Sequence, residues 1–319
     1  MISFDLHRPA GATRTAGTAR AACILAVAGA LVLAGCSSKK STTTSTSSTP
    51  AAPASSAAVG GDAASLVPAA VKSSGSLTIA TDASYAPNEF KDTDGKTIIG
   101  MDVDLGNAIA AKLGLKASFQ DVTFDQIIPG LAGGKYNLGM SSFTDTKDRE
   151  GKVDFVTYFT AGTSVLVLKG NPAKITGPDD LCGHKVAIES GTTQELVDIP
   201  AKTKACTKAG KKAVVAVALP DQNAASLADQ SGRADATLAD SPVAEYQAKQ
   251  PGAKFEVAGK SYSDAPYGIA IPKDAGTLKD AVLAAVKALI ADGSYKTILD
   301  KWSIADGAIT SPVIDGATS

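Results

Sequence analysis

The chain has 319 residues, of which 44% are hydrophobic and 20% are charged. This composition is typical of a globular protein with about two domains and excludes a chain that is disordered throughout. The formal net charge is -1, and the scattered basic residues provide no face for nucleic acid. Only His7 and His184 are histidines, and no Cys/His cluster has metal-ligand spacing, so we expect no metal and no cofactor.

The N-terminal residues predict an export signal. Arginines precede the apolar run of residues 21–34, "AACILAVAGALVLA", which is too short to span a bilayer but has the length of a signal-peptide core. The next motif, "LAGC", resembles a bacterial lipoprotein box. We therefore predict that residues 1–35 are a signal peptide and that Cys36 carries a lipid. The alternative is a secreted protein in which this cysteine occurs by chance.

A low-complexity segment follows Cys36. Residues 37–61, "SSKKSTTTSTSSTPAAPASSAAVGG", contain almost no large apolar side chain and cannot bury enough surface to fold. We predict that residues 36–75 form a flexible tether. The protein is then held on the extracytoplasmic face of the cell membrane by its lipid anchor.

Cysteine usage agrees with an exported protein. If Cys23 is removed with the signal and Cys36 carries the lipid, Cys182 and Cys206 remain as a pair in an oxidising compartment. We expect a disulfide between them, with two separate buried thiols as the alternative. In the chain-entropy model, closing a loop of this size stabilises the fold by roughly 3.5 kcal/mol.

From residue 77 onward, predicted strands and helices alternate. The apolar run "LTIAT", residues 77–81, indicates a buried strand, and Leu105, Ile109 and Leu113 share one helical face before Gly114. This alternation predicts parallel α/β sheets. The further predicted strands are 117–122, 138–143, 185–190, 213–219 and 234–239, and the further predicted helices are 124–132, 192–199, 223–230 and 242–250.

Polar residues occur where these predicted strands end. Ligands of parallel α/β sheets bind outside the carboxyl ends of the strands. We therefore expect these side chains to meet at one edge of the sheets. They are Asp82, Ser141, Ser142, Glu189 and Asp240.

Residues 139–155, "GMSSFTDTKDREGKVDF", place small hydroxyl side chains shortly before Arg149. Ser141, Ser142, Thr144 and Thr146 offer short donors and acceptors, and Arg149 offers a planar, permanently charged fork. This combination suits a small carboxylate. The alternative is an ordinary polar turn after a strand.

Eight segments in this order and spacing resemble the polar amino-acid-binding proteins of bacterial ABC importers, known as solute-binding protein family 3. The resemblance runs from about residue 77 to residue 302. The segments are "ATDASYAP" (80–87), "GMDVDL" (100–105), "FDQIIPGL" (124–131), "SSFTDTKDR" (141–149), "VDF" (153–155), "ESGTTQE" (189–195), "GRADATLADSP" (232–242) and "DAPYGIAI" (264–271).

The resemblance implies an α/β fold of the periplasmic-binding-protein-like type II class. Two α/β lobes are joined by two hinge crossovers, and the ligand cleft lies between the lobes. The implied boundaries are 76–162 and 266–305 for lobe 1, 163–265 for lobe 2 and 306–319 for a C-terminal tail, with crossovers near 160–165 and 263–268.

The resemblance also implies how an amino acid is held. Arg149 pairs with the ligand α-carboxylate through two parallel bonds, and Thr144 and the backbone at Ser142 complete this shell. Thr193 offers its amide and hydroxyl to the same carboxylate at a helix N-terminus. A simple helix cap is the alternative role for Thr193.

Asp240 accepts from the ligand α-ammonium in the same resemblance, with an N-cap as its other possible role. Tyr85 and Phe124 flank the ligand side chain, although isolated aromatic residues are more often part of a core. One position departs from the family. Where many relatives read "YPPFEF", this chain reads "YAPNEF" and places Asn88 beside the pocket, which puts side-chain specificity in doubt.

The expected function is that of an extracytoplasmic substrate-binding lipoprotein. It captures a polar L-amino acid by hinge closure and delivers it, as a monomer, to ABC permease and ATPase subunits. The alternative is an enzyme on the same fold, similar to cyclohexadienyl dehydratase. Glu189 would be its acid or base by position alone, and no second activating group, nucleophile or metal accompanies it, so we expect no catalytic residue.

The ligand side chain is predicted from Asp82, Glu189 and Asn88. A closed cleft cannot leave such groups unpaired without a penalty of about 1 to 3 kcal/mol each, so the ligand should bring donors. This favours arginine, lysine or histidine, then glutamine or asparagine, and disfavours glutamate and large aliphatic residues. In the alternative, Glu189 turns outward and pairs with Lys185 or solvent.

Overall fold

The computed structural model describes residues 63–318. The predicted signal peptide, Cys36 and the low-complexity segment that follows it lie outside the described residues. Within residues 63–318, no helix combines the length and the apolar character needed to cross a bilayer.

Helices and strands follow one another as the alternation predicts. The elements before the first long strand are η1 (Ala63–Leu66), α1 (Ala69–Ser74), β1 (Ser76–Thr81), β2 (Ser84–Tyr85), β3 (Glu89–Lys91), β4 (Ile98–Ile99), α2 (Met101–Lys112), β5 (Lys116–Asp121), α3 (Phe124–Ala132), β6 (Leu138–Gly139) and α4 (Lys147–Glu150). Next come β7 (Val153–Leu168), η2 (Pro178–Asp180), β8 (Lys185–Glu189), the π-helical turn η3 (Gln194–Asp198), α5 (Ile199–Lys208), β9 (Val215–Leu219), α6 (Gln222–Gln230), β10 (Ala236–Asp240) and α7 (Ser241–Lys249). The last elements are β11 (Phe255–Pro272), α8 (Leu278–Ala291), α9 (Ser294–Trp302) and η4 (Ala305–Gly307).

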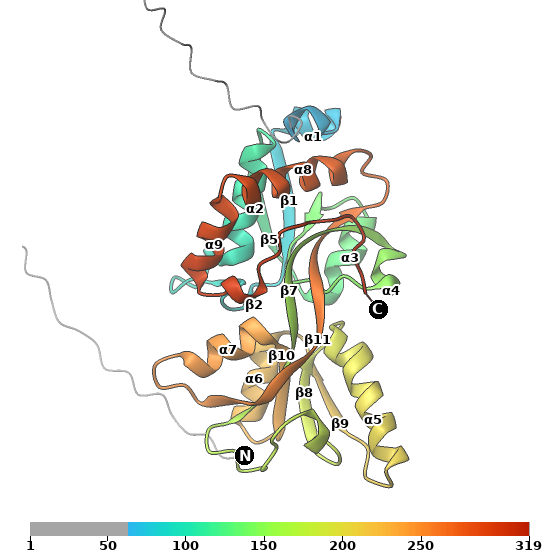
Figure 1. Cartoon of the computed structure of the whole chain (residues 1–319), viewed down its shortest axis with the longest axis vertical. Coiled ribbons are helices and arrows are strands. Elements are labelled where there is room, and N and C mark those ends of the chain that lie inside the picture. The colour runs from blue at the N-terminus through green and yellow to red at the C-terminus, as the bar shows by residue number, and fades with distance from the viewer. Residues whose placement is uncertain (1–62, 319) are drawn as a thin grey trace, which may run out of the picture. The chain divides into compact units, whose positions relative to one another are not determined.

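One eight-stranded sheet has the order β5-β1-β6-β11-β7-β10-β8-β9. Strand β1 pairs in parallel with β5 and β6, and β8 pairs in parallel with β9 and β10. The long strands β7 and β11 are antiparallel to each other and connect these two parallel groups. In Figure 1 they run from the region of α2, α3, α8 and α9 to the region of α5, α6 and α7. Both predicted crossovers fall within these two strands.

The core of lobe 1 contains the predicted apolar face of α2. Leu105 and Ile109 are fully buried and belong to the same cluster as Leu77 and Ile79 of β1. The helix ends at Lys112, shortly before Gly114, whose φ of 71° is the left-handed conformation that commonly terminates a helix. The regularly spaced apolar residues therefore form the buried face of the helix, and the glycine follows its end, as the sequence predicts.

Two predicted boundaries need correction. The tether was expected to extend to residue 75, but helices η1 and α1 occupy much of residues 63–74. Ala63 and Val67 are buried in the core of lobe 1, and the Thr277 hydroxyl donates to the Leu66 carbonyl at 2.6 Å. The low-complexity composition ends at Gly61, and the apolar side chains that follow provide surface to bury. Residues 313–317 of the predicted C-terminal tail also pack against lobe 1, where the Thr157 amide donates to the Val313 carbonyl at 2.9 Å.

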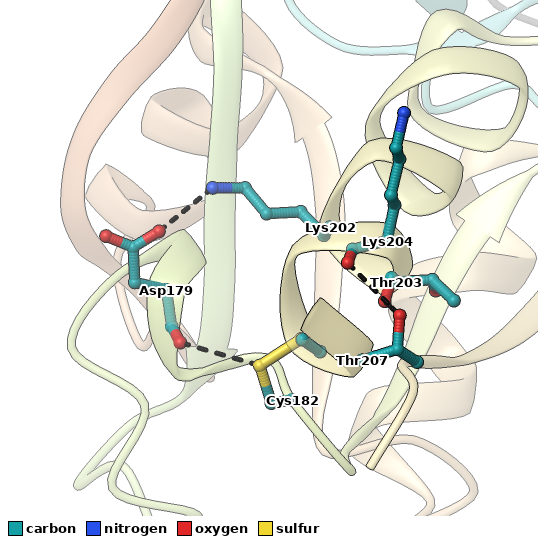
Figure 2. The surroundings of a disulfide bond; sticks show 7 residues. Asp179, Cys182, Lys202, Thr203, Lys204 and Thr207 are labelled. Atoms are coloured by element: carbon teal, nitrogen blue, oxygen red, sulfur yellow. Dashed lines mark hydrogen bonds and ion pairs between the residues drawn. A yellow bond between two sulfur atoms is a disulfide. The ribbon is translucent and has the colours of Figure 1, made fainter. Parts of the chain in front are cut away.

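Lobe 2 contains the disulfide expected from the cysteine count, between Cys182 and Cys206. It joins the segment before β8 to helix α5, where Cys206 is buried. Figure 2 shows Cys182 near this helix, with Lys202 of α5 reaching the Asp179 carboxylate at 3.0 Å. Since this ion pair is largely exposed, the disulfide is the stronger of the two links.

Removing the disulfide is expected to destabilise the protein strongly. The two cysteines are 24 positions apart. In the chain-entropy model, opening a loop of this length in a Cys182→Ser/Cys206→Ser variant lowers the free energy of unfolding by about 3.5 kcal/mol. Urea denaturation of the variant and of oxidised and reduced wild type measures this loss. Equal stability of the oxidised and reduced proteins would contradict the prediction.

Candidate functional site

A small cavity lies between the two lobes and is lined by residues of both. Every residue predicted to face the ligand except Asp82, Asn88 and Glu189 lines it. The lining residues are Tyr85, Phe124, Ser141, Ser142, Thr144, Arg149, Thr192, Thr193, Gln194, Gln222 and Asp240. A larger crevice, between α7 and α9, contains none of the predicted residues. The structure therefore brings residues from distant parts of the sequence to one place, outside the ends of the strands.

Arg149 projects from the short helix α4 and reaches both lobes. Its Nη1 donates to the Thr144 carbonyl at 2.8 Å, and its Nη2 donates to the Gly191 carbonyl of lobe 2 at 2.9 Å. The guanidinium carbon lies 5.3 Å from the ring centroid of Phe124 and 5.2 Å from that of Phe143, within cation–π range. Burial lowers the pKa of Arg149 to about 10, so the side chain remains charged at neutral pH.

Ser141 and Ser142 lie on a loop rather than on the predicted strand 138–143. Strand β6 ends at Gly139, and Ser142 has a φ of 51°, which a pleated strand cannot contain. The Ser142 amide donates to Asp102 Oδ2 at 3.1 Å and so points into lobe 1. This contact differs from the expectation that the Ser142 backbone binds the ligand carboxylate. Both serines nevertheless line the cavity.

Two fully buried carboxylates, Glu89 and Asp102, hold this loop from the core side. Glu89 accepts from the hydroxyls of Ser141 and Ser142, each at 3.2 Å. Asp102 Oδ2 also accepts from the Tyr158 hydroxyl at 2.8 Å. Burial, followed by the charge of Asp102, raises the pKa of Glu89 well above its usual value, whereas burial raises that of Asp102 to about 6. Burial therefore disfavours the charge of Glu89 more strongly than that of Asp102.

Asn88 does not line the cavity, contrary to the expectation that its amide faces the ligand. It is fully buried, and its Nδ2 donates to the Ser142 hydroxyl at 2.9 Å. The substitution that distinguishes "YAPNEF" from its relatives therefore supports the serine loop.

Asp240 ends β10 and directs its carboxylate to the cavity rather than to the helix that follows. It makes no side-chain cap bond to α7. Its Oδ1 accepts from Gln194 Nε2 at 2.7 Å and its Oδ2 from the Tyr267 hydroxyl at 2.6 Å. Burial raises the pKa of Asp240 to about 6, against the lowering effect of these two bonds, so it is ionised at neutral pH. An ionised carboxylate on a cavity wall suits a cationic ligand group.

Thr193 lines the cavity and makes no cap bond to the helical turn that follows it. The capping contact is made by its neighbour, since Thr192 Oγ1 accepts from the Glu195 amide at 3.3 Å. The Thr192 hydroxyl also donates to the Glu189 carbonyl at 2.7 Å. Thr193 therefore does not have the pure capping role that was its alternative.

Asp82 and Glu189 are buried near the cavity but do not line it. Asp82 Oδ2 accepts from the Phe124 amide at 3.1 Å, and burial raises its pKa to about 6. Glu189 is 1% exposed, and neither carboxylate oxygen makes a well-formed hydrogen bond among residues 63–318, although the side chains of Tyr85 and Asp82 lie close enough to shift its pKa. Burial, followed by the charge of Asp82, raises the pKa of Glu189 to about 10. Glu189 thus does not turn outward to pair with Lys185 or solvent.

Three further residues line the cavity without having been predicted: Thr192, Gln194 and Gln222. Thr192 and Gln194 belong to the motif "ESGTTQE", so their position in this motif could have predicted that they line the cavity. Gln222 begins α6 and is 2% exposed, and its Nε2 has no partner in the described part of the chain. Its backbone amide donates across the lobes to the Ser84 hydroxyl at 3.2 Å.

Comparisons with known proteins agree on one family. Residues 77–305 match the bacterial extracellular solute-binding proteins, family 3. The arginine-binding protein ArgT of Corynebacterium glutamicum is 34% identical over 251 residues, which cover 79% of this chain and 82% of that protein.

Solved structures have the same fold. An ancestral arginine-binding protein bound to arginine matches with a TM-score of 0.65 and 36% identity, covering 72% of this chain and 98% of that one. An ancestral amino acid-binding protein, described as a precursor of cyclohexadienyl dehydratase, matches with a TM-score of 0.65 and 37% identity over 73% of this chain and 97% of that one.

Proposed function

Because the chain belongs to the bacterial extracellular solute-binding proteins, family 3, we propose that it binds an L-amino acid between its lobes for an ABC importer. The observation that carries this proposal is the placement of Arg149 and Asp240 on one cavity. A buried guanidinium pairs with the ligand α-carboxylate, and a buried carboxylate pairs with the α-ammonium. The two charges come from different lobes, so a zwitterion that pairs with both favours closure.

The remaining lining residues complete the proposed site. Thr144 and Thr193 serve the carboxylate end, and Ser141 and Ser142, whose hydroxyls donate to Glu89, form the cavity wall beside them. Tyr85 and Phe124 flank the ligand side chain, and their ring centroids are 6.1 Å apart. Asp82 and Glu189 interact with the end of the ligand side chain that is farthest from the ligand α-carbon.

We propose that the ligand is cationic. Glu189 is a buried carboxylate without a well-formed hydrogen bond among residues 63–318, and Asp82 lies close enough for its charge to raise the pKa of Glu189. A ligand cation would pair with the ionised form of Glu189 and with Asp82, whereas an acidic side chain would add a like charge to this end. Several relatives carry names that fit this class, including the arginine-binding protein described above. Arginine is therefore the first candidate, followed by lysine and histidine, with glutamine next.

Calorimetric titration of the purified protein with L-arginine, lysine, histidine, glutamine, glutamate and leucine tests both proposals. Binding of arginine or lysine, with weak binding of glutamate and leucine, is expected. If no amino acid binds, the proposed function is wrong; if glutamate or leucine binds most tightly, the cationic class is wrong. Recovery of the bound amino acid without chemical change separates a binding protein from the alternative enzyme.

Delivery to a permease requires that the lobes close and reopen. Bonds between the lobes support a closed arrangement, including those from Arg149 to the Gly191 carbonyl and from the Gln222 amide to the Ser84 hydroxyl. We propose that the permease and ATPase subunits receive the amino acid from this form. No residue in this scheme has a catalytic role.

We further propose that Cys36 is lipid-modified and anchors the protein outside the cell membrane. Two or more acyl chains hold a protein on a bilayer much better than one. A Cys36→Ala variant should leave the membrane fraction and appear in the soluble extracytoplasmic fraction, as immunoblotting of cell fractions would show. A Ser37→Ala variant keeps the cysteine and should stay with the membrane. Continued sedimentation of the Cys36→Ala protein with membranes would refute the anchor.

A further inference from the structure

Residues 313–317, here called the C-terminal strap, lie beyond the segment that matches the family, which ends at residue 305. The strap runs along the first half of β7. The Thr157 amide donates to the Val313 carbonyl at 2.9 Å, and the Val313 amide donates to the Thr157 hydroxyl at 2.9 Å. Asp315 exchanges two bonds with Phe155, one at 3.0 Å from its own amide and one at 2.9 Å to its carboxylate.

In this position the strap covers one edge of strand β7. In lobe 1 the strand β7 pairs with β11 on one side, while β10 pairs with β7 only from Thr163 onward. The other side of the first half of β7 would therefore be an unpaired strand edge. An isolated antiparallel bridge between Val156 and Ile314 shows that the strap occupies this edge.

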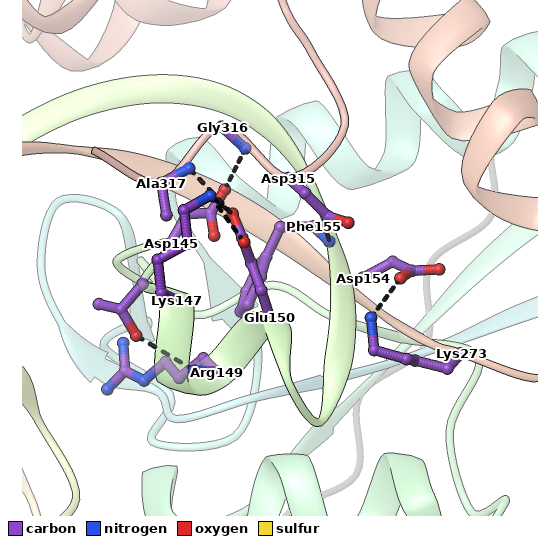
Figure 3. A network of polar contacts seen from close by, with 11 residues as sticks. Asp145, Lys147, Arg149, Glu150, Asp154, Phe155, Lys273, Asp315, Gly316 and Ala317 are labelled. Carbon is purple, nitrogen blue, oxygen red and sulfur yellow. Dashed lines mark hydrogen bonds and ion pairs between the residues drawn. The ribbon is translucent and has the colours of Figure 1, made fainter. Parts of the chain in front are cut away.

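The strap also contacts the short segment that carries Arg149 (Figure 3). The Gly316 amide donates to Asp145 Oδ2 at 2.8 Å, and the Ala317 amide donates to Glu150 Oε1 at 3.0 Å. Asp145 lies just before α4, and Glu150 is its last residue, so the strap binds the Arg149 segment at both ends. A helix of one turn, Lys147–Glu150, has too few internal bonds to hold its own orientation.

We propose that the C-terminal strap is a positioning element for the ligand-carboxylate site: by holding Asp145 and Glu150, it fixes α4 so that the Arg149 guanidinium points into the cavity. This inference rests on the proposed amino-acid function. The Asp145 amide also donates to the Pro266 carbonyl at 2.8 Å, so the segment is held between the strap and β11. Without the strap, the segment is held from the β11 side alone, through this bond and the bridge between Thr144 and Tyr267.

The electrostatics of Asp145 agree with this arrangement. Asp145 is fully buried, and burial raises its pKa to about 7, while the Gly316 amide lowers it. The nearby carboxylates of Glu150 and Asp315 raise it further. The amides of the strap therefore supply hydrogen bonds to a group of acidic side chains next to Arg149.

The first test is a chain that ends after Ser311, titrated with L-arginine in a calorimeter. Loss of the two bonds to Asp145 and Glu150 is expected to weaken binding by about ten-fold. A Gly316→Val variant provides a second test at full length. A Cβ atom at Gly316 would lie 2.7 Å from Thr157 Cγ2, which forces the strap to move. The matched control is Thr310→Val, which introduces the same side chain at an exposed residue before the strap and should bind as wild type does.

A double-mutant cycle with Arg149→Lys separates positioning from general stabilisation. If the strap acts through Arg149, truncation weakens L-arginine binding much less in the Arg149→Lys background than in wild type. Equal fold-losses in the two backgrounds, or wild-type affinity in a folded truncated chain, would overturn the proposal. If the truncated chain does not fold, Gly316→Val decides by the same cycle. Failure of wild type to bind any amino acid would instead refute the proposed function.

Discussion

Replacing Arg149 with alanine is expected to weaken amino-acid binding by about thirty-fold to a few thousand-fold, which corresponds to roughly 2 to 5 kcal/mol. The variant would leave the ligand carboxylate buried without its charged partner. It would also remove the bond to the Gly191 carbonyl and the contacts with the rings of Phe124 and Phe143. No other described cation lines the cavity to replace it.

Titration calorimetry of Arg149→Ala, Arg149→Lys and Lys152→Ala measures this effect. Lysine retains the positive charge but not the planar fork, so Arg149→Lys should have an intermediate affinity. Lys152 lies nearby in sequence and pairs with the exposed Asp148, which makes Lys152→Ala a suitable surface control. Wild-type affinity in Arg149→Ala would show that the ligand carboxylate binds elsewhere.

Replacing Glu189 with glutamine should weaken the binding of a cationic amino acid by about a hundred-fold or more, because removing one member of a buried ion pair costs roughly 3 to 5 kcal/mol. Glutamine has nearly the same shape, so the change removes charge rather than volume. Binding of L-glutamine should not weaken, since it brings no cation to this end of the cavity. The comparison of L-arginine and L-glutamine in both proteins is the measurement.

Proton release provides an independent readout. Burial, followed by the charge of Asp82, raises the pKa of Glu189 to about 10, so this carboxyl is protonated at neutral pH until a cation arrives. A bound ligand cation lowers that pKa, and binding then releases a proton. Calorimetry in buffers of different ionisation enthalpy detects the release in wild type, and Glu189→Gln should lack it. Unchanged arginine affinity in the variant would show that Glu189 does not contact the ligand side chain.

The family and the two-lobed fold predicted from eight short motifs are confirmed by the comparisons. Local rules explain why the helices were predictable. The spacing of Leu105 and Ile109 sets the buried face of α2, and Gly114 follows its end. Strand ends were less predictable, because β6 stops where Ser142 adopts a positive φ, and bonds to Glu89 and Asp102 from distant segments accompany that conformation.

Other features of the site depend on contacts between residues that are far apart in the sequence. No local sequence pattern predicts such contacts. The burial of Asn88 follows from its bond to Ser142, which lies 54 positions away in the sequence. Gln222 reaches the cavity only because α6 of lobe 2 meets Ser84 of lobe 1. The strap has few apolar residues and acts mainly through backbone amides, which carry no sequence signature.

The two long strands determine which movements the lobes can make. Strands β7 and β11 are hydrogen-bonded to each other in both lobes, so the connection is a two-stranded ribbon rather than two independent linkers. Sliding one strand past the other would break many hydrogen bonds together, whereas bending breaks few. Register shifts between Ala258 and Tyr262 and between Tyr262 and Ala265 interrupt the ribbon near the junction, where such irregularities allow a bend. Bending is therefore the main movement left to the lobes, and closing them around a small ligand costs the protein little conformational entropy.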